Sequence, residues 1–127
     1  MGMSSKFEIN TLNEVNEKAI YKFISEKNEE NDDFFYPLIE QINEALEDED
    51  ELSTSTKLYL VPEEEPSWYD YDEEFLELSK HFPDAIFEVY KTDENFEEVC
   101  VVYFKNGKKQ YEPAVITYGK FDENMLK

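Results

Sequence analysis

The sequence predicts an α+β protein in which helices pack on one face of an antiparallel sheet. Its 127 residues are the length of one ordinary domain. Hydrophobic residues make up 40% of the chain and aromatic residues 16%, enough to build a core. Helical periodicity predominates in the first half of the chain, and strand patterns predominate in the second half. We therefore treat residues 1–127 as a single domain, with flexible ends expected at residues 1–5 and 121–127.

The first half of the chain predicts a strand followed by two helices. Residues 6–9 alternate between polar and apolar, as a half-buried strand does. Residues 11–14 then match a capping box, and apolar residues recur at helical spacing through residues 12–24. A second apolar stripe covers residues 35–46, and we expect Pro37 in its first turn, where the missing N–H costs least.

The second half predicts one more helix and four strands. Residues 57–61 form the first strand, and Asp70 or Asp72 can cap a helix that Pro83 ends. Further strands are expected at residues 85–90, 99–104 and 109–118. An Asn-Gly dipeptide at 106–107 joins the last two, and it favours a type I′ hairpin. The predicted order is β-α-α-β-α-β-β-β.

Charge is the main constraint on function. The chain carries 32 Asp and Glu residues against 12 lysines and no arginine, a formal net charge of −20. Without arginine it lacks the planar donor that recognises phosphate and guanine, and its field repels polyanions. We therefore expect no direct binding to nucleic acid or to an anionic membrane, and we expect a basic protein partner.

Cysteine and histidine content argue against a metal site, a cofactor or a disulfide. Cys100 is the only cysteine, so neither an internal disulfide nor a thiolate metal cluster can form. His81 is the only histidine, and we expect it at or near the surface. The acidic stretch 70–74 lacks the glycine and ligand spacing of a calcium loop. No signal peptide or membrane span is apparent, so the expected location is the cytoplasm of a bacterial host cell.

One stretch resembles a known family. It comprises the aromatic loop 68–71, the helix 75–80, Phe-Pro-Asp-Ala-Ile-Phe at 82–87 and Val-Tyr-Phe-Lys-Asn-Gly-Lys at 102–108. Together these segments resemble the YubB-type ferredoxin-like domain, found in small proteins of phages and other mobile elements. The resemblance implies a ferredoxin-like variant, a split β-α-β sandwich, and carries no catalytic residues. The chain departs from the pattern at residues 92–95, which replace an expected glycine-rich turn.

The acidic residues are clustered. Residues 26–51 hold 12 acids and one lysine, and residues 63–74 hold seven acids and no lysine. A solvated surface is the simplest explanation, but solubility requires a net charge of only about 2–8 in magnitude. Duplex DNA presents one negative charge per about 1.7 Å of its axis, a density that closely spaced carboxylates can imitate.

Aromatic residues lie between the acidic runs. Trp68 and Tyr69 either pack into the core or, if exposed, serve as anchors for a partner. The predicted partner-binding residues are Glu47, Asp48, Glu49, Asp50, Glu51, Glu63, Glu64, Glu65, Trp68, Tyr69, Asp70, Asp72, Glu73 and Glu74.

These patterns predict an inhibitor rather than an enzyme. The first hypothesis is a phage or mobile-element protein that imitates nucleic acid and blocks a basic host protein, a nuclease or a Cas effector, as anti-CRISPR proteins do. The alternative is an immunity protein that neutralises a cationic nuclease toxin. A small-ligand binder or enzyme is the third possibility, yet three glycines, one histidine and no arginine supply little for oxyanion or phosphate handling.

Overall fold

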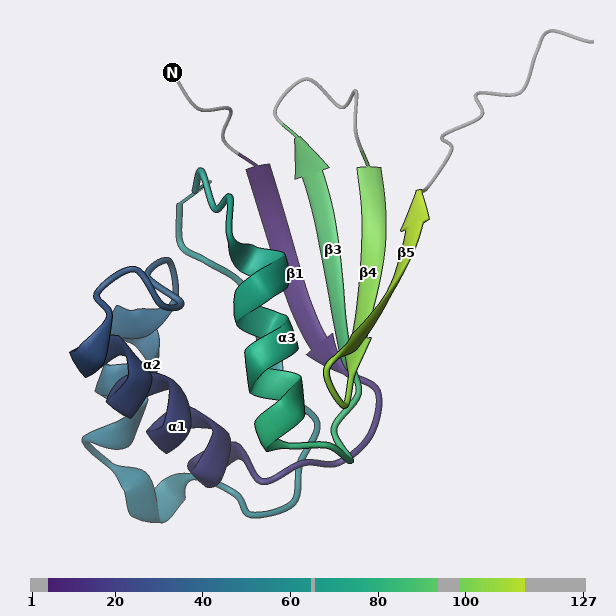
Figure 1. The fold of residues 1–127 in the computed structure, drawn as a ribbon. Coiled ribbons are helices and arrows are strands. Elements are labelled where there is room, and N and C mark those ends of the chain that lie inside the picture. Colours follow the sequence, from purple (N-terminus) through teal and green to yellow (C-terminus); the bar gives the residue numbers. More distant parts are fainter. Residues whose placement is uncertain (1–4, 65, 94–98, 114–127) are drawn as a thin grey trace, which may run out of the picture.

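The computed structural model describes residues 5–64, 66–93 and 99–113. Its elements are β1 (Ser5–Thr11), α1 (Glu17–Glu30), α2 (Ile39–Leu46), the 3-10 turn η1 (Glu49–Glu51), β2 (Tyr59–Leu60), α3 (Tyr71–His81), β3 (Phe87–Asp93), β4 (Val99–Lys105) and β5 (Lys108–Pro113). The predicted α+β class and the predicted order of elements along the chain are confirmed (Figure 1).

The strands form one five-stranded antiparallel sheet with the order β2-β1-β3-β4-β5. Two strands distant in sequence pair near its centre. β1 pairs with β3 along seven residues, from Ser5 opposite Asp93 to Thr11 opposite Phe87. A ferredoxin-like arrangement is not confirmed by this strand order. Alternate side chains of β1, β3 and β4 point to one face, where most of them are buried, whereas all side chains of β5 are exposed.

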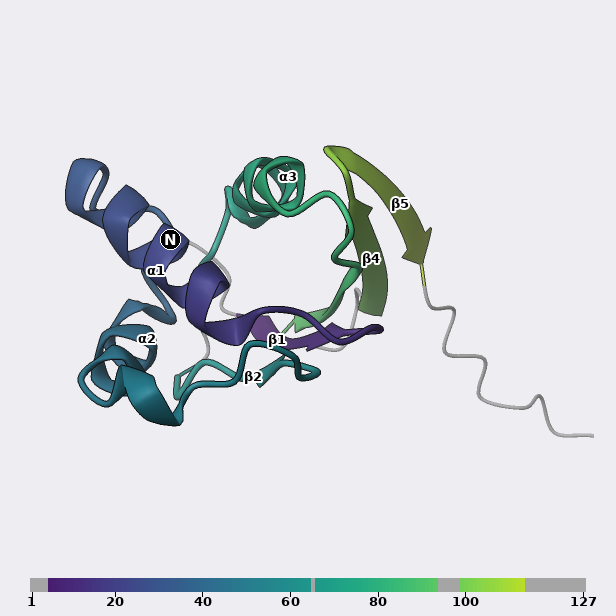
Figure 2. The same cartoon turned by 90° about the horizontal axis from the view of Figure 1, so that it is seen from below.

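The helices lie on one side of this sheet. Figure 2 shows α3 within the concave side of the curved sheet and α1 with α2 beside it, away from β4 and β5. Aromatic rings join the layers: the Phe75 ring of α3 lies 5.3 Å from Phe104 and 5.9 Å from Phe87, between ring centres. No helix of the described residues covers the convex face, which we call the open face (Figure 2).

The hairpin between β4 and β5 forms as expected. Asn106 and Gly107 have φ angles of 50° and 72°, the two positive values that a type I′ turn requires. The Gly107 N–H donates to the Ser79 hydroxyl at 2.9 Å, which attaches the turn to the end of α3. A Cβ atom at Gly107 would lie 2.6 Å from the Lys80 side chain, so both conformation and space favour glycine there.

The predicted start of the first helix is wrong. α1 begins at Glu17, and the Asn16 side chain caps it by accepting from the Ala19 N–H at 3.0 Å. Thr11, the expected capping residue, remains in β1, and its hydroxyl accepts from the Leu58 N–H at 2.7 Å. Pairing with β3 therefore extends the strand to Thr11, the first residue of the predicted capping box.

The predicted start of the second helix is also wrong. α2 begins at Ile39, so Pro37 precedes it instead of occupying its first turn. Phe35 has a φ of 54°, in the left-handed region, and its side chain is buried. The Phe35 N–H donates to the Glu74 carboxylate, which holds this conformation. Because Glu74 is distant in sequence, the residues around Phe35 give no signal of this bond.

Strand lengths differ from the predicted ones as well. The strand expected at residues 57–61 is only Tyr59–Leu60, and the strand expected at 85–90 is Phe87–Asp93. Ser5 belongs to β1, although residues 1–5 were expected to be a flexible end. The expected strand segment 114–118, the expected tail 121–127 and part of the turn 92–95 lie outside the described residues.

Candidate protein-binding surface

Negative charge is concentrated in the segment between β1 and β3. This segment, residues 12–86, contains 23 acidic residues and five lysines, whereas β1, β3, β4 and β5 together contain four acidic residues and five lysines. We call residues 12–86 the helical segment. Figure 1 shows that its helices lie together on one side of the long strands, so the surplus charge belongs to that side of the molecule.

Part of this charge lines a groove between α2 and the loop that follows β2. The groove has a volume of about 520 Å³ and is lined by Tyr36, Pro37, Glu40, Gln41, Glu44, Glu63, Glu64 and Pro66. Glu40 and Glu44 are one turn apart on α2 and face the glutamates of the loop. We call this feature the acidic groove.

Two hydrogen bonds hold the walls of the acidic groove together. The Gln41 amide donates to the Val61 carbonyl at 3.1 Å, and the Tyr36 hydroxyl donates to the Ser67 carbonyl at 2.8 Å. Both bonds run from the chain around α2 to the loop after β2. The spacing of the carboxylates is therefore set by the fold and does not depend on mobile side chains alone.

The four carboxylates of the acidic groove have no internal counter-ion among the described residues. The described ion pairs involve other acids: Glu49, Glu77 and Asp72. Like charges at this spacing repel each other, and a cation supplied from outside relieves that repulsion. The groove is therefore better suited to a basic partner than to any other surface ligand.

Tyr36 lines the acidic groove, and Tyr69 lies near Tyr36. The Tyr69 side chain is 68% exposed and that of Tyr36 is 42% exposed. Burial raises the pKa of Tyr36, and the negative charge of Glu74 and the nearby Tyr69 raise it further. Large, partly rigid rings beside charged groups are favoured at the centres of protein interfaces. Tyr69 thus has the exposure that the predicted anchor requires.

Trp68, the other predicted anchor, is not available to a partner. It is only 3% exposed, and its ring packs within 5.3 Å of Phe7 and of Phe35, between centroids. This prediction is corrected: Trp68 belongs to the core, because its large apolar surface fills the space between β1 and the loop before α2.

Glu74 is also buried, which corrects its prediction as a partner-binding residue. It is 9% exposed, and one carboxylate oxygen accepts from both the Phe35 N–H and the Trp68 indole N–H. These donors belong to the two walls of the acidic groove, next to Tyr36 and Ser67. Burial raises the pKa of Glu74 to about 7, although the two hydrogen bonds act in the opposite direction.

The run from Glu47 to Glu51 lies elsewhere. It follows the C-terminal end of α2, whereas the acidic groove flanks residues 40–44. Glu49 forms ion pairs with Lys22 at 3.3 Å and Lys18 at 3.9 Å on α1, while Glu47, Asp48, Asp50 and Glu51 are exposed. The structure therefore does not bring this run together with Glu63 and Glu64.

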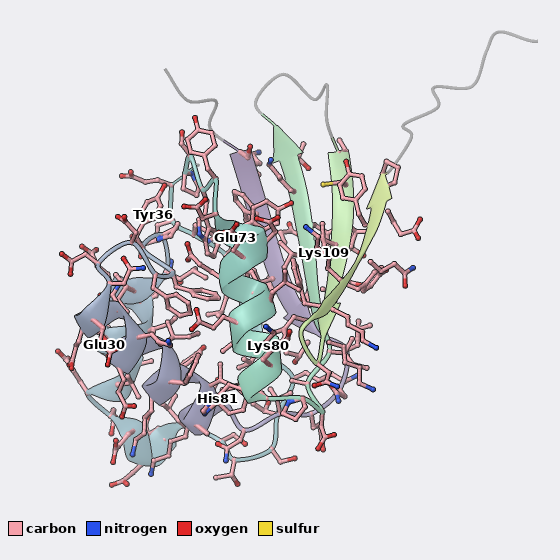
Figure 3. All side chains as sticks on the ribbon, viewed as in Figure 1. Glu30, Tyr36, Glu73, Lys80, His81 and Lys109 are labelled. Carbon is pink, nitrogen blue, oxygen red and sulfur yellow. The ribbon has the colours of Figure 1, made fainter. Side chains whose placement is uncertain are left out.

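The acids at the start of α3 differ in their surroundings. Asp70 precedes the helix without a side-chain capping bond, and Asp72 pairs with Lys109 of β5 at 3.0 Å. Acidic side chains in a first turn favour the helix dipole. Glu73 is exposed, and Figure 3 places it at the same end of the helical segment as Tyr36. Glu65 lies outside the described residues.

Sequence reasoning missed half of the acidic groove. Tyr36, Glu40, Gln41 and Glu44 were not among the predicted residues, and they come from a part of the chain distant from Glu63 and Glu64. The spacing of Glu40 and Glu44 on the polar side of a predicted helix was the one signal available. Which loop they face depends on tertiary packing.

The remaining candidate groups have simple environments. His81 is exposed and stacks on the Phe23 ring at 4.2 Å between centroids, in agreement with its expected surface position. Cys100 is fully buried, as expected for an inert core thiol. Within the described ranges no group of three or more His, Cys, Asp or Glu residues could hold a metal ion. The helices of those ranges include none long and apolar enough to cross a membrane.

Comparisons with protein-family models, with curated proteins and with solved structures find no match to this chain. The resemblance to the YubB-type domain therefore stays a prediction.

Proposed function

We propose that this protein is an acidic inhibitor that binds a basic, nucleic-acid-binding protein, and that it acts as a binding protein rather than an enzyme. The observation that carries the proposal is the acidic groove, in which Glu40, Glu44, Glu63 and Glu64 lie together without a cation among the described residues. Tyr36 and Tyr69 beside it supply the contact area that charge alone lacks.

Electrostatics favours this class of partner. A groove that binds nucleic acid is lined with lysine and arginine, which contact successive phosphates. Carboxylates gathered in one groove compete for those cations and also accelerate the encounter, because opposite fields steer association. The surplus charge of the rest of the helical segment adds to this steering, while the groove and its tyrosines supply the close contacts.

The resemblance to the YubB-type domain suggests the biological setting in which such an inhibitor would act. A ferredoxin-like relationship would imply a phage or mobile-element origin, and the partner would then be a host defence protein in the bacterial cytoplasm. A nuclease is the first class to test, with a Cas effector as the specific case. Such an inhibitor gains by occupying the nucleic-acid site itself, since that site is basic in every nuclease it meets.

The test is capture of the partner followed by competition. The tagged protein and a matched variant with Glu40, Glu44, Glu63 and Glu64 all changed to glutamine are incubated with host lysate at low salt, and bound proteins are eluted with rising salt. We expect the unmodified protein to retain nucleic-acid-binding proteins that leave at high salt, and added duplex DNA to displace them. The glutamine variant should retain much less.

Three outcomes would contradict the proposal: captured proteins that do not bind nucleic acid, retention that ignores salt, or retention that DNA does not affect. The purified partner then separates the two kinds of inhibitor. Inhibition of a defence nuclease or Cas effector supports the first hypothesis, and exclusive inhibition of a toxin nuclease identifies an immunity protein instead.

A further inference from the structure

The open face of the sheet carries a compact group of tyrosine and glutamate side chains. Glu88 on β3 lies directly opposite Tyr103 on β4, and Tyr90, two residues further along β3, points to the same face. Directly opposed side chains in an antiparallel pair lie about 5 Å apart at Cβ, and diagonal ones about 7–8 Å. The two rings therefore flank one carboxylate.

The neighbouring strands add two more carboxylates to this group. Glu8 of β1 lies opposite Tyr90, and Glu112 of β5 lies opposite Val101, which itself pairs with Tyr90. We call Glu8, Glu88, Tyr90, Tyr103 and Glu112 the tyrosine-glutamate platform. It spans the four long strands, and no helix of the described part of the chain covers it (Figure 2).

The local field on the platform is negative. The charge of Glu88 raises the pKa of Tyr90, with burial, a hydrogen bond to Glu88 and the charge of Glu8 adding to the effect. Burial raises the pKa of Tyr103, and Glu88, Tyr90 and Glu112 raise it further. Both shifts have the sign expected where anions converge on phenol rings.

Lysines stand at the margins of this face and not within it. Lys6 lies two residues from Glu8 on β1, so both side chains point to the open face. Lys105 lies two residues from Tyr103 on β4 and is paired with Lys108 of the hairpin. The strands that carry the platform are therefore nearly neutral overall, but their middle row is acidic and aromatic. This arrangement differs from the helical segment, where acids dominate throughout.

We propose that the tyrosine-glutamate platform is a second binding surface, for an extended polypeptide segment that carries arginine at alternate positions. An arginine guanidinium is planar, stacks on a tyrosine ring and donates to a carboxylate through two parallel bonds. The platform offers a ring beside a carboxylate at two places. Glu88 lies beside both Tyr90 and Tyr103, and Glu8 also lies opposite Tyr90.

Spacing supports an extended occupant. Residues two apart in an extended chain point to the same side and lie roughly 6.6 Å apart, close to the diagonal separation of about 7–8 Å between Tyr90 and Tyr103. Nucleic acid is a poor alternative occupant although aromatic rings on a sheet can stack bases, because three carboxylates would face its phosphates. This inference does not depend on the acidic groove.

The test is an NMR titration of the intact protein at low salt with acetyl-Arg-Ser-Arg-amide. We expect the ring signals of Tyr90 and Tyr103 to shift in a saturable manner, and those of Tyr111, which is exposed on the other face of β5, to change little. Acetyl-Lys-Ser-Lys-amide carries the same charge and should bind about two- to fivefold more weakly, because an ammonium stacks less well on the ring.

A matched pair of variants locates the effect. Glu88→Gln should weaken the arginine peptide several-fold, whereas Glu73→Gln, which removes the same charge from the start of α3, should leave the platform signals unchanged. The proposal is overturned if all exposed tyrosines shift alike, if the lysine peptide binds as well as the arginine peptide, or if the two variants behave identically. The double variant Glu63→Gln with Glu64→Gln removes two charges from the acidic groove and should not alter the titration of the platform. The two proposed binding surfaces are therefore tested separately.

Discussion

The helical segment and the four long strands are built from the same core yet carry different charge. Residues 12–86 hold 23 of the acidic residues, and the long strands hold four, balanced by five lysines. Both regions place aromatic rings in the shared interior, where Phe35 and Phe75 meet Phe87 and Phe104. Among the described acids of the helical segment only Glu74 is buried, so the acidity is otherwise a property of the outer surface.

The first prediction concerns Trp68, which belongs to the interior of the helical segment. Trp68→Ala should lower the free energy of unfolding by about 3–5 kcal/mol, because it leaves a cavity among β1, α3 and the loop before α2 and removes a donor from Glu74. Urea unfolding followed by circular dichroism measures the change. A loss below about 1 kcal/mol would mean that the ring is not packed as described.

The second prediction concerns Glu74, the buried acid of an otherwise exposed set. Its pKa is raised from 4.5 to about 7 in the folded protein, so the folded state holds a proton that the unfolded state releases in that range. Its contribution to stability is fully present below pH 4.5 and is lost as pH rises through about 7. The full loss is at most about 3 kcal/mol.

Unfolding free energies of the wild type and Glu74→Gln, measured across this pH range, isolate the effect. The difference between the two proteins should change with pH, whereas Glu73→Gln, which removes an exposed neighbouring charge, should follow the wild type. If Glu74→Gln and the wild type show parallel pH profiles, Glu74 does not titrate as described.

The third prediction concerns the two separate acidic runs of the helical segment. Reversing Glu40, Glu44, Glu63 and Glu64 to lysine should weaken partner binding on the order of a hundredfold at low salt, mainly through faster dissociation. Reversing Glu47, Asp48, Asp50 and Glu51 makes the same change in net charge. It should act mainly on the association rate, which surface plasmon resonance separates from dissociation. Equal effects on dissociation would show that net charge matters and the groove does not.

The fourth prediction concerns the neighbouring aromatic residues Trp68 and Tyr69. Tyr69 is 68% exposed, so Tyr69→Ala should leave the free energy of unfolding within about 0.5 kcal/mol of the wild type. Affinity for the partner should fall roughly tenfold, since an exposed ring beside charged groups acts as an anchor. Isothermal titration calorimetry measures this loss. Unchanged affinity would remove Tyr69 from the binding surface.

The smallest effect is expected at the ion pair that joins the two regions. Lys109 of β5 and Asp72 of α3 lie 3.0 Å apart, and their side chains are 46% and 36% exposed. Lys109→Met should therefore change the free energy of unfolding by less than about 1 kcal/mol, and high salt should abolish the difference. Lys108→Met, in the same hairpin, is the control. A larger, salt-independent loss would indicate a packing role for the Lys109 side chain.

Periodicity predicted the elements of this fold because they depend on local sequence. Neighbours in the chain determine the Asn106-Gly107 turn, the polar-apolar alternation of β1 and β3 and the apolar faces of the helices. The starts of α1 and α2 were missed for the opposite reason. Pairing of Thr11 with Phe87 extends β1, and Glu74 fixes Phe35, so both boundaries are set by residues distant in sequence.

The types of residue in the candidate site were predictable from the sequence, but their positions were predictable only in part. Composition indicated acids with aromatic anchors, and Glu63, Glu64 and Tyr69 do lie on or beside the acidic groove. Burial of Trp68 and Glu74 could not be derived from a run of residues that alternate between acidic and aromatic. The platform on the open face was equally hidden, because it needs the register of four strands.

The pairing of β1 with β3 has a consequence for how the protein is made. Phe7 leaves the ribosome long before Lys91, its partner in the sheet, so β1 has only the short pairing with β2 until β3 has been made. During that interval the emerging chain is the acidic part of the protein. We therefore expect its negative charge to oppose contact between nascent copies until β3 pairs with β1.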